Sequence, residues 1–304
     1  MRIFFLTIIF FGTLAASASP NSDPYQYFDN GDVKIAYRVF GTGAPLFLLN
    51  GGPGRSSDTF TELAQILSSK NRSVIIFDQR GTGRSKLKVA DETTITLDLM
   101  VGDLEALRKY LHFNKVDILG HSFGGMYAMA YAVQYPQNIR ALILSASGGV
   151  DLSWQDYSYH NMLSRLTQKS RNKIAFWTSP EQQKKDPTRS FLESTRLLVP
   201  AYIYHQKFVP KLVHDLANLN YSNPDINNLV WKSMEKYDLK GAFKNFQAPT
   251  LIIDGRQDIL GEAVPIGIHN EIPNSRLELL DECSHYPWLD SPDKYFSLIN
   301  DFLG

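Results

Sequence analysis

The sequence is poor in cysteine and has no excess of charge of either sign. Its 304 residues include one cysteine, Cys283, so the chain can form neither an internal disulfide nor a cysteine-rich metal site. Basic and acidic side chains number 31 each, whereas a nucleic-acid-binding protein normally has a basic surplus, so we expect no nucleic-acid partner. The hydrophobic fraction of 43% and the charged fraction of 20% are those of a globular protein, which excludes a disordered or coiled-coil chain.

Motifs for metals and nucleotide cofactors are also missing. The sequence has no H-E-x-x-H and no C-x-x-C pattern, and Cys283 with His285 lacks two further ligands at metal spacing. Residues 81–83 (Gly-Thr-Gly) look like the start of a dinucleotide loop, but Lys86 stands where the third glycine is needed. We therefore expect no metal and no cofactor, and we interpret Cys283 as a buried, unreactive thiol.

A long apolar run occurs at the start of the chain. A basic start, Met1-Arg2, precedes the apolar stretch 3–14, and small residues follow at 16–18. This is the layout of a secretory signal peptide. A membrane anchor is the alternative, but a span needs about 20 apolar residues and this run is shorter. We predict that residues 1–18 are removed near Ala18 and that the protein is secreted or periplasmic, without stable membrane insertion.

Beyond this run, strand-like and helix-like segments alternate. Helical spacing of apolar residues predicts helices at 96–111 and 292–303. Short, continuous apolar runs predict strands at residues 45–49, 73–77, 116–119, 141–144, 250–253 and 277–280. Continuous apolar strands separated by helices indicate a mostly parallel α/β sheet with helices on both faces.

One long segment lacks this alternation. Residues 151–246 favour helix and are rich in lysine and glutamine, with no strand rhythm. We interpret this segment as a helical cap inserted into a sheet domain formed by residues 19–150 and 247–304.

The strongest chemical signal is a G-x-S-x-G pattern at residues 120–124, with Ser122 at its centre. It follows the predicted strand 116–119 at once and precedes a helix-like run at 125–130. A strand–serine–helix turn projects the serine hydroxyl from the carboxyl edge of the sheet. The start of the helix also supplies partial positive charge for a developing oxyanion. We predict that Ser122 is a nucleophile.

A nucleophilic serine needs a base and a carboxylate that orients this base. His285 follows the last predicted strand and is the expected base, whereas His121 adjoins Ser122 on a tight turn and is poorly placed for this role. Asp258 follows the strand 250–253 on a loop that can reach the imidazole, and Asp254 at the strand end is the alternative. We expect activity to fall below neutral pH, because a protonated imidazole cannot accept the serine proton.

Two further loops follow predicted strands. The glycine-rich loop 50–54 can place a backbone N–H beside that of Phe123, which follows the nucleophile, and two such groups form an oxyanion hole. Asp78 and Arg80 follow the strand 73–77, and we interpret them as a partly buried ion pair that ties loops together beneath the site.

Taken in chain order, these motifs resemble the α/β-hydrolase superfamily. The series comprises residues 51–54 (Gly-Gly-Pro-Gly), 78–85, 120–124, 255–258 and His285. The first two motifs are similar to those of the proline iminopeptidase (prolyl aminopeptidase) family of serine peptidases. The resemblance covers the sheet domain, roughly residues 25–148 and 247–304, and implies an α/β-hydrolase fold.

The resemblance also implies roles for individual residues. Ser122 would be the nucleophile, His285 the base and Asp258 the acid of a triad, with Gly52 and Phe123 as oxyanion donors. In that family acidic residues of the cap bind the free amino terminus of the substrate.

Candidate residues for this substrate-binding role are Glu193 and Glu235, with Glu181 as a third.

Three motifs depart from the family pattern. Asn50 stands where a histidine usually precedes the Gly-Gly-Pro-Gly, and Ser284 stands where a glycine commonly precedes the catalytic histidine. The serine turn has His121 and Phe123, as in general esterases and carbon–carbon hydrolases, instead of glycine and tryptophan or tyrosine.

These features predict an exported serine hydrolase, with an aminopeptidase as the leading function. It would release an N-terminal proline or small residue from short peptides or amides. A carboxylesterase or another small-molecule hydrolase is the alternative within enzymes. A non-catalytic, hydrolase-like binding protein is the alternative outside them, and such a protein would normally have a broken triad.

Overall fold

The computed structural model describes residues 24–304, so the expected signal peptide and the cleavage site near Ala18 lie outside the described residues. The described chain forms an eight-stranded sheet in the order β1-β2-β4-β3-β5-β6-β7-β8. The strands are β1 (Gln26–Asn30), β2 (Val33–Phe40), β3 (Ala44–Leu49), β4 (Arg72–Phe77), β5 (Val116–His121), β6 (Ile139–Ser145), β7 (Thr250–Gly255) and β8 (Ser275–Leu280). All pairings from β4 to β8 are parallel, as predicted, whereas β1 with β2 and β2 with β4 are antiparallel.

The six strands predicted from apolar runs coincide with β3 to β8. Strands β3 to β7 are largely buried because helices cover both faces of the sheet, whereas β8, at the sheet edge, is mostly half-buried. The hairpin of β1 and β2 was not predicted. Most residues of β1 are exposed at the sheet edge, so this strand has no continuous apolar run that would reveal it.

Helices cover the two faces of the sheet in two separate apolar cores. Residues of α2, α3 and α10 pack on one face, and residues of α1 and α12 pack on the other. The helices of the sheet domain are α1 (Thr61–Leu67), α2 (Leu97–Tyr110), α3 (Phe123–Gln134), α10 (Ala263–Glu271), α11 (Pro287–Asp290) and α12 (Pro292–Leu303). Neighbouring residues of one strand face different cores; Phe47, for example, lies in the first core and Leu46 and Leu48 in the second.

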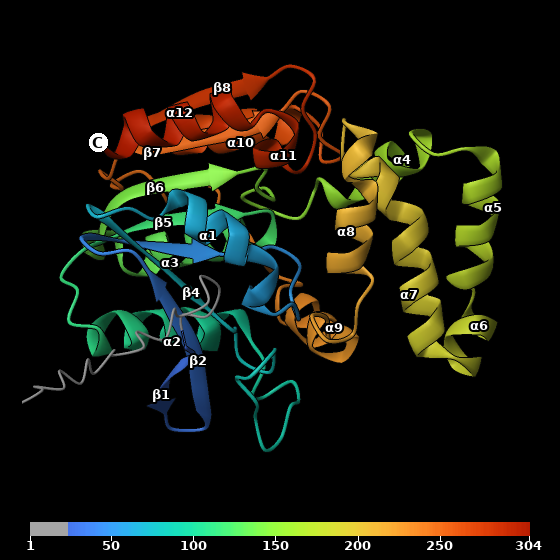
Figure 1. The fold of residues 1–304 in the computed structure, drawn as a ribbon, viewed down its shortest axis with the longest axis horizontal. Helices are drawn as coiled ribbons and strands as arrows, with labels where there is room; N and C mark the ends of the chain where they lie inside the picture. Colours follow the sequence, from blue (N-terminus) through green and yellow to red (C-terminus); the bar gives the residue numbers. More distant parts are fainter. Residues whose placement is uncertain (1–23) are drawn as a thin grey trace, which may run out of the picture.

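The segment between β6 and β7 is helical and lies beyond the ends toward which the parallel strands point (Figure 1). It contains α4 (Gln155–Ser164), α5 (Gln168–Trp177), α6 (Pro180–Lys185), α7 (Pro187–Leu198), α8 (Val209–Leu216) and α9 (Pro224–Ser233). Short 3-10 turns are η1 (Ser57–Phe60), η2 (Pro136–Asn138), η3 (Val199–Ala201) and η4 (Gln206–Phe208).

The cap helices have clear start signals. Side chains that accept a backbone N–H of the first turn precede four of them: Thr167, Ser179, Asp186 and Asn223. Proline follows at the first helical position of α6, α7 and α9, where its missing N–H costs no hydrogen bond. None of the helices in residues 24–304 is long and apolar enough to cross a membrane.

Candidate active site

Ser122 occupies a sharp turn between β5 and α3. Its backbone has φ +56° and ψ −122°, a left-handed conformation that a residue with a side chain rarely adopts. Glycines on either side are required: a Cβ at Gly120 would overlap the carbonyl of Gly124, and one at Gly124 would overlap the carbonyl of Leu49. The turn therefore presents the Ser122 hydroxyl at the carboxyl end of β5.

The structure brings Ser122, His285 and Asp258 together in one hydrogen-bonded series. Nε2 of His285 lies 2.9 Å from Oγ of Ser122, and Nδ1 of His285 lies 2.8 Å from Oδ2 of Asp258. The other carboxylate oxygen of Asp258 accepts the backbone N–H of Leu260 at 2.7 Å. His285 is 4% exposed and Asp258 is 2% exposed, so both are largely shielded from water.

Asp254 and Asp258 are both buried, but their protonation differs. Burial opposes ionisation of Asp258, yet the charge of His285 and the hydrogen bond from it outweigh this cost and hold the pKa of Asp258 below its usual value. Burial, the charge of Asp258 and a hydrogen bond with Asp258 raise the pKa of Asp254 well above its usual value. Asp258 is thus the carboxyl that favours the ionised form beside His285, and Asp254 favours the neutral form.

His121 is buried beside the series without joining it. Its Nε2–H donates to the backbone carbonyl of His285 at 2.8 Å, and its Nδ1 has no hydrogen-bond partner among the described residues. Burial and the charge of His285 lower the pKa of His121 to about 3. A neutral imidazole packed at 4.7 Å from the ring of Trp288 therefore supports the backbone of His285.

The glycine-rich loop after β3 lies against the serine turn. A Cβ at Gly51 would stand 2.6 Å from Cβ of Ser122, so no larger residue fits there. Gly52 has φ +69°, and both Gly52 and Phe123 line the cavity in front of Ser122. Nδ2 of Asn50 donates to the carbonyl of Arg55 at 3.2 Å, which closes the loop.

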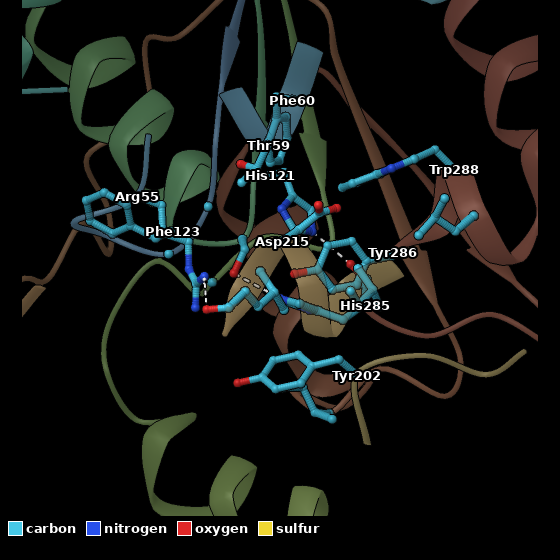
Figure 2. Close-up of a pocket in the computed structure, with 18 of the residues that line it drawn as sticks. Arg55, Thr59, Phe60, His121, Phe123, Tyr202, Asp215, His285, Tyr286 and Trp288 are labelled. Carbon is cyan, nitrogen blue, oxygen red and sulfur yellow. Dashed lines mark hydrogen bonds between the residues drawn. The ribbon is translucent and has the colours of Figure 1, made fainter. Parts of the chain in front are cut away.

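A cavity of about 400 Å³ opens onto the Ser122 hydroxyl (Figure 2). Much of its wall is apolar and includes Met126, Trp154, Met162, Trp231, Ile259 and Leu260. Two cations and two anions other than the triad also line it: Arg55, Lys211, Glu62 and Asp215. Nζ of Lys211 lies 2.9 Å from Glu62 and 3.4 Å from Asp215, so both of these carboxylates share one ammonium group.

The structure does not bring the predicted substrate-binding residues Glu193 and Glu235 to this cavity. Glu193 pairs with Arg196 on the same helix at 2.7 Å, and Glu235 lines a separate groove beside Lys232. Sequence reasoning missed Glu62 and Asp215, which do line the cavity, because α1 and α8 meet only in the folded chain and no spacing signals their contact.

The predicted ion pair of Asp78 with Arg80 is wrong. Asp78 is fully buried, and its oxygens accept the backbone N–H groups of Ser57 at 2.8 Å and Arg84 at 2.7 Å. Arg80 instead points to α2 and forms two hydrogen bonds of 2.7 Å with the carboxylate of Asp103. Adjacent loop residues thus tie two different parts of the fold together, because their side chains diverge.

Cys283 is buried two residues before His285. Burial and the nearby carboxylates, Asp290 first among them, raise the pKa of its thiol well above the usual range. A buried thiol without thiolate character is a poor nucleophile.

The fold and the geometry of this site agree with a family match over most of the chain. Residues 44–292 match the family described as the alpha/beta hydrolase fold. The chain belongs to the α/β-hydrolase family, and its fold and its sequence similarity to other members identify it as a hydrolase.

Within this family the chain is similar to proline iminopeptidases. The enzyme of Lactobacillus delbrueckii subsp. lactis is 28% identical over 289 residues, which cover 91% of this chain and 97% of the relative. The enzyme of Saccharolobus solfataricus is 30% identical, with 88% of this chain and 87% of the relative covered. The crystal structure of the Mycobacterium smegmatis proline iminopeptidase matches in fold with a TM-score of 0.69 at 20% identity, covering 92% of this chain and 97% of that one.

Proposed function

We propose that this protein is a serine hydrolase that transfers an acyl group from an amide or ester to water. The observation that carries the proposal is the hydrogen-bonded series Ser122–His285–Asp258, which faces a cavity of about 400 Å³. In this proposal Ser122 is the nucleophile, His285 is the general base and Asp258 orients the imidazole.

The geometry supports a two-step acyl transfer. Nε2 of His285 accepts the proton of Ser122 while Oγ attacks the substrate carbonyl carbon. Backbone N–H groups of Gly52 and Phe123 would stabilise the resulting oxyanion. The imidazolium then gives its proton to the leaving amine or alcohol, and a water molecule activated by the same base releases the acyl group from Ser122.

The finer proposal is an aminopeptidase that releases an N-terminal proline or small residue from short peptides or amides. Its support is the similarity to proline iminopeptidases over 88% or more of the chain. In this reading the substrate ammonium would compete with Lys211 for Asp215 and Glu62, since these are the acidic residues of the cavity wall outside the triad.

A carboxylesterase is the second candidate. The observation in its favour is that Lys211 already pairs with both Glu62 and Asp215, so residues 24–304 leave a largely apolar cavity without a free carboxylate for an ammonium group.

A substrate panel separates the two candidates. Proline and alanine arylamides are compared with their N-acetylated forms and with acetyl and butyryl esters. An aminopeptidase hydrolyses the free-amine arylamides and loses activity on the acetylated ones, because the ammonium is blocked. Turnover of the esters without any turnover of the amides contradicts the aminopeptidase and supports the esterase.

The nucleophile itself is tested with Ser122→Ala. We expect this variant to lose labelling by a fluorophosphonate probe and to lose activity by about 10⁴-fold or more. The exposed helix residue Ser164 provides the matched control, and Ser164→Ala should label like the original protein. A wild-type protein that the probe does not label would support the non-catalytic, hydrolase-like alternative.

A further inference from the structure

Arg55 lines the catalytic cavity, and part of its guanidinium makes no hydrogen bond within residues 24–304. Nη1 donates to the carbonyl of Leu216 and to the hydroxyl of Ser222, each at 3.0 Å, and both acceptors are uncharged. Within residues 24–304 no carboxylate forms an ion pair with it, and Nε and Nη2 make no hydrogen bond. These two nitrogens are not among the fully enclosed polar atoms, so a ligand can reach them.

The free nitrogens form one edge of the guanidinium, and this protein uses the same edge elsewhere to bind carboxylates. Nε and Nη2 of Arg80 donate to the two oxygens of Asp103, each at 2.7 Å. Nε and Nη2 of Arg108 donate to the two oxygens of Glu105 at 2.8 and 2.7 Å. This paired geometry is the strongest that arginine offers a carboxylate, and Arg55 presents it without a protein partner.

Arg55 is held next to the place where the scissile carbonyl would lie. A Cβ at Gly52 would stand 2.3 Å from Nε and 2.5 Å from Cδ of Arg55, so the arginine side chain, including Nε, lies against the candidate oxyanion loop. Its loop is tied to the cap by hydrogen bonds of 2.8 Å from the N–H of Ser56 to Tyr221 and from the N–H of Asn223 to Gly54. The guanidinium is therefore positioned before any ligand arrives.

Two phenols share this side of the cavity. Tyr202 and Tyr286 line the cavity, and their hydroxyl groups point toward the side where Arg55 lies (Figure 2). Burial raises the pKa of both phenols, so both remain hydrogen-bond donors. Asp215, whose charge also acts on Arg55, is held by Lys211 at 3.4 Å and His214 at 3.0 Å.

A partly buried cation without a counter-ion is costly unless a ligand supplies the opposite charge. We infer that Arg55, together with the hydroxyls of Tyr202 and Tyr286, forms a subsite for a carboxylate of the substrate. The preferred substrates are then amides or esters that carry a carboxylate a few bonds from the scissile carbonyl. This inference rests on the proposed hydrolase function of the same cavity, and the carboxylate can belong to the leaving group or to the acyl group.

Equilibrium binding to the Ser122→Ala protein tests the subsite without any chemistry. Two ligand pairs are measured by titration calorimetry: alanyl-alanine against alanyl-alaninamide, and monomethyl adipate against methyl adipamate. We expect the carboxylate member of one pair to bind about 10- to 100-fold more tightly than its neutral partner, the range expected for hydrogen bonds to a charged group. The dipeptide pair reports a carboxylate on the leaving group, and the adipate pair reports one on the acyl group.

Substitution of Arg55 shows whether the preference comes from this residue. In Ser122→Ala/Arg55→Met the preference should vanish, and in Ser122→Ala/Arg55→Lys it should be partly retained, because lysine keeps the charge but not the paired donors. Tyr202→Phe in the Ser122→Ala protein should reduce the preference less than Arg55→Met does.

Two results overturn the inference: equal binding of both members in both pairs, or a preference that Arg55→Met leaves unchanged. If Arg55→Met does not fold, Arg55→Lys and Tyr202→Phe in the Ser122→Ala protein still decide, because each should reduce the preference measured without them. If the proposed function is wrong, the fluorophosphonate probe does not label the wild-type protein. If only the subsite is wrong, this labelling remains.

Discussion

Asp254 near the end of β7 and Asp258 in the loop after it show how a difference of four positions changes the pKa of a carboxyl group. Asp258 contacts the imidazole of His285 at 2.8 Å, which lowers its pKa, whereas burial and the charge of Asp258 raise the pKa of Asp254. The sequence favoured Asp258 but left Asp254 open, since both follow the same strand. Only the distance to His285 separates them.

Asparagine at each position should therefore have different effects. Asp258→Asn should lower kcat by about 10⁴-fold, because the imidazole loses its orienting charge and tautomer. Asp254→Asn should retain most activity, because an amide resembles the neutral carboxyl in shape and can still donate a hydrogen bond to Asp258. Steady-state kinetics on the most active substrate of the panel measure both effects, and an equally large loss in Asp254→Asn would contradict the assignment.

His121 predicts a dependence of stability on acidity. Its pKa is lowered to about 3 in the native protein from an ordinary 6.5, so between these values the unfolded chain binds a proton that the native protein does not. The free energy of unfolding should then fall as the pH falls from 6.5 toward 3, by at most about 1.4 kcal/mol per pH unit from this group.

Urea unfolding of His121→Gln over the same pH range should show a flatter dependence. The control is His269→Gln, because His269 is exposed at the surface whereas His121 is buried. An unchanged slope in His121→Gln would refute the expected contribution.

At the scale of elements, local pattern was sufficient where an element has a continuous apolar run or apolar residues at helical spacing. The apolar runs predicted β3 to β8, and the helical spacing near the end predicted α12 at Pro292–Leu303. The exposed edge strand β1 has no such run, and the divergent contacts of Asp78 and Arg80 depend on partners in other elements. Sequence pattern alone therefore could not predict this strand or these contacts.

Two glycines test the packing around the serine turn. Gly124→Ala should lower the free energy of unfolding by about 1–3 kcal/mol, because the added Cβ overlaps the Leu49 carbonyl. Gly102 lies within α2 with open space around its Cβ position, so Gly102→Ala should raise this free energy by about 0.5–1 kcal/mol. Urea titrations of both variants measure the free energy of unfolding. Equal effects would show that crowding at Gly124 does not determine the loss of stability.

At the scale of the whole molecule, the site depends on segments far apart in the sequence. Arg55 and Ser222 meet across 167 positions, and Ser122 and His285 meet across 163. The cap thus does more than cover the sheet edge. It supplies Lys211 and Asp215 to the cavity and the acceptors that orient Arg55.

Export is predicted for the chain that carries residues 1–18. When the full sequence is expressed in a bacterium with a periplasm, we expect a periplasmic protein whose first residue is Ser19, as measured by mass spectrometry. Ala18→Arg should block cleavage and leave a longer precursor, because the processing site requires small residues. A cytoplasmic wild-type protein that retains residues 1–18 would contradict export.

Local pattern was enough to predict the parallel sheet, the serine turn and the position of His285 near it. Apolar runs in the sequence mark where each strand ends, and the carboxyl ends of parallel strands meet at one edge of the sheet. Which carboxylates and cations line the cavity could not be predicted from the sequence. Glu193 and Glu235 were the expected acids, yet Glu62 and Asp215 reach the cavity, and Arg55 lies there with an unused edge. These positions follow from the packing of α8 and its neighbours against the loops of the sheet, and contacts between such distant segments leave no periodic signal in the sequence.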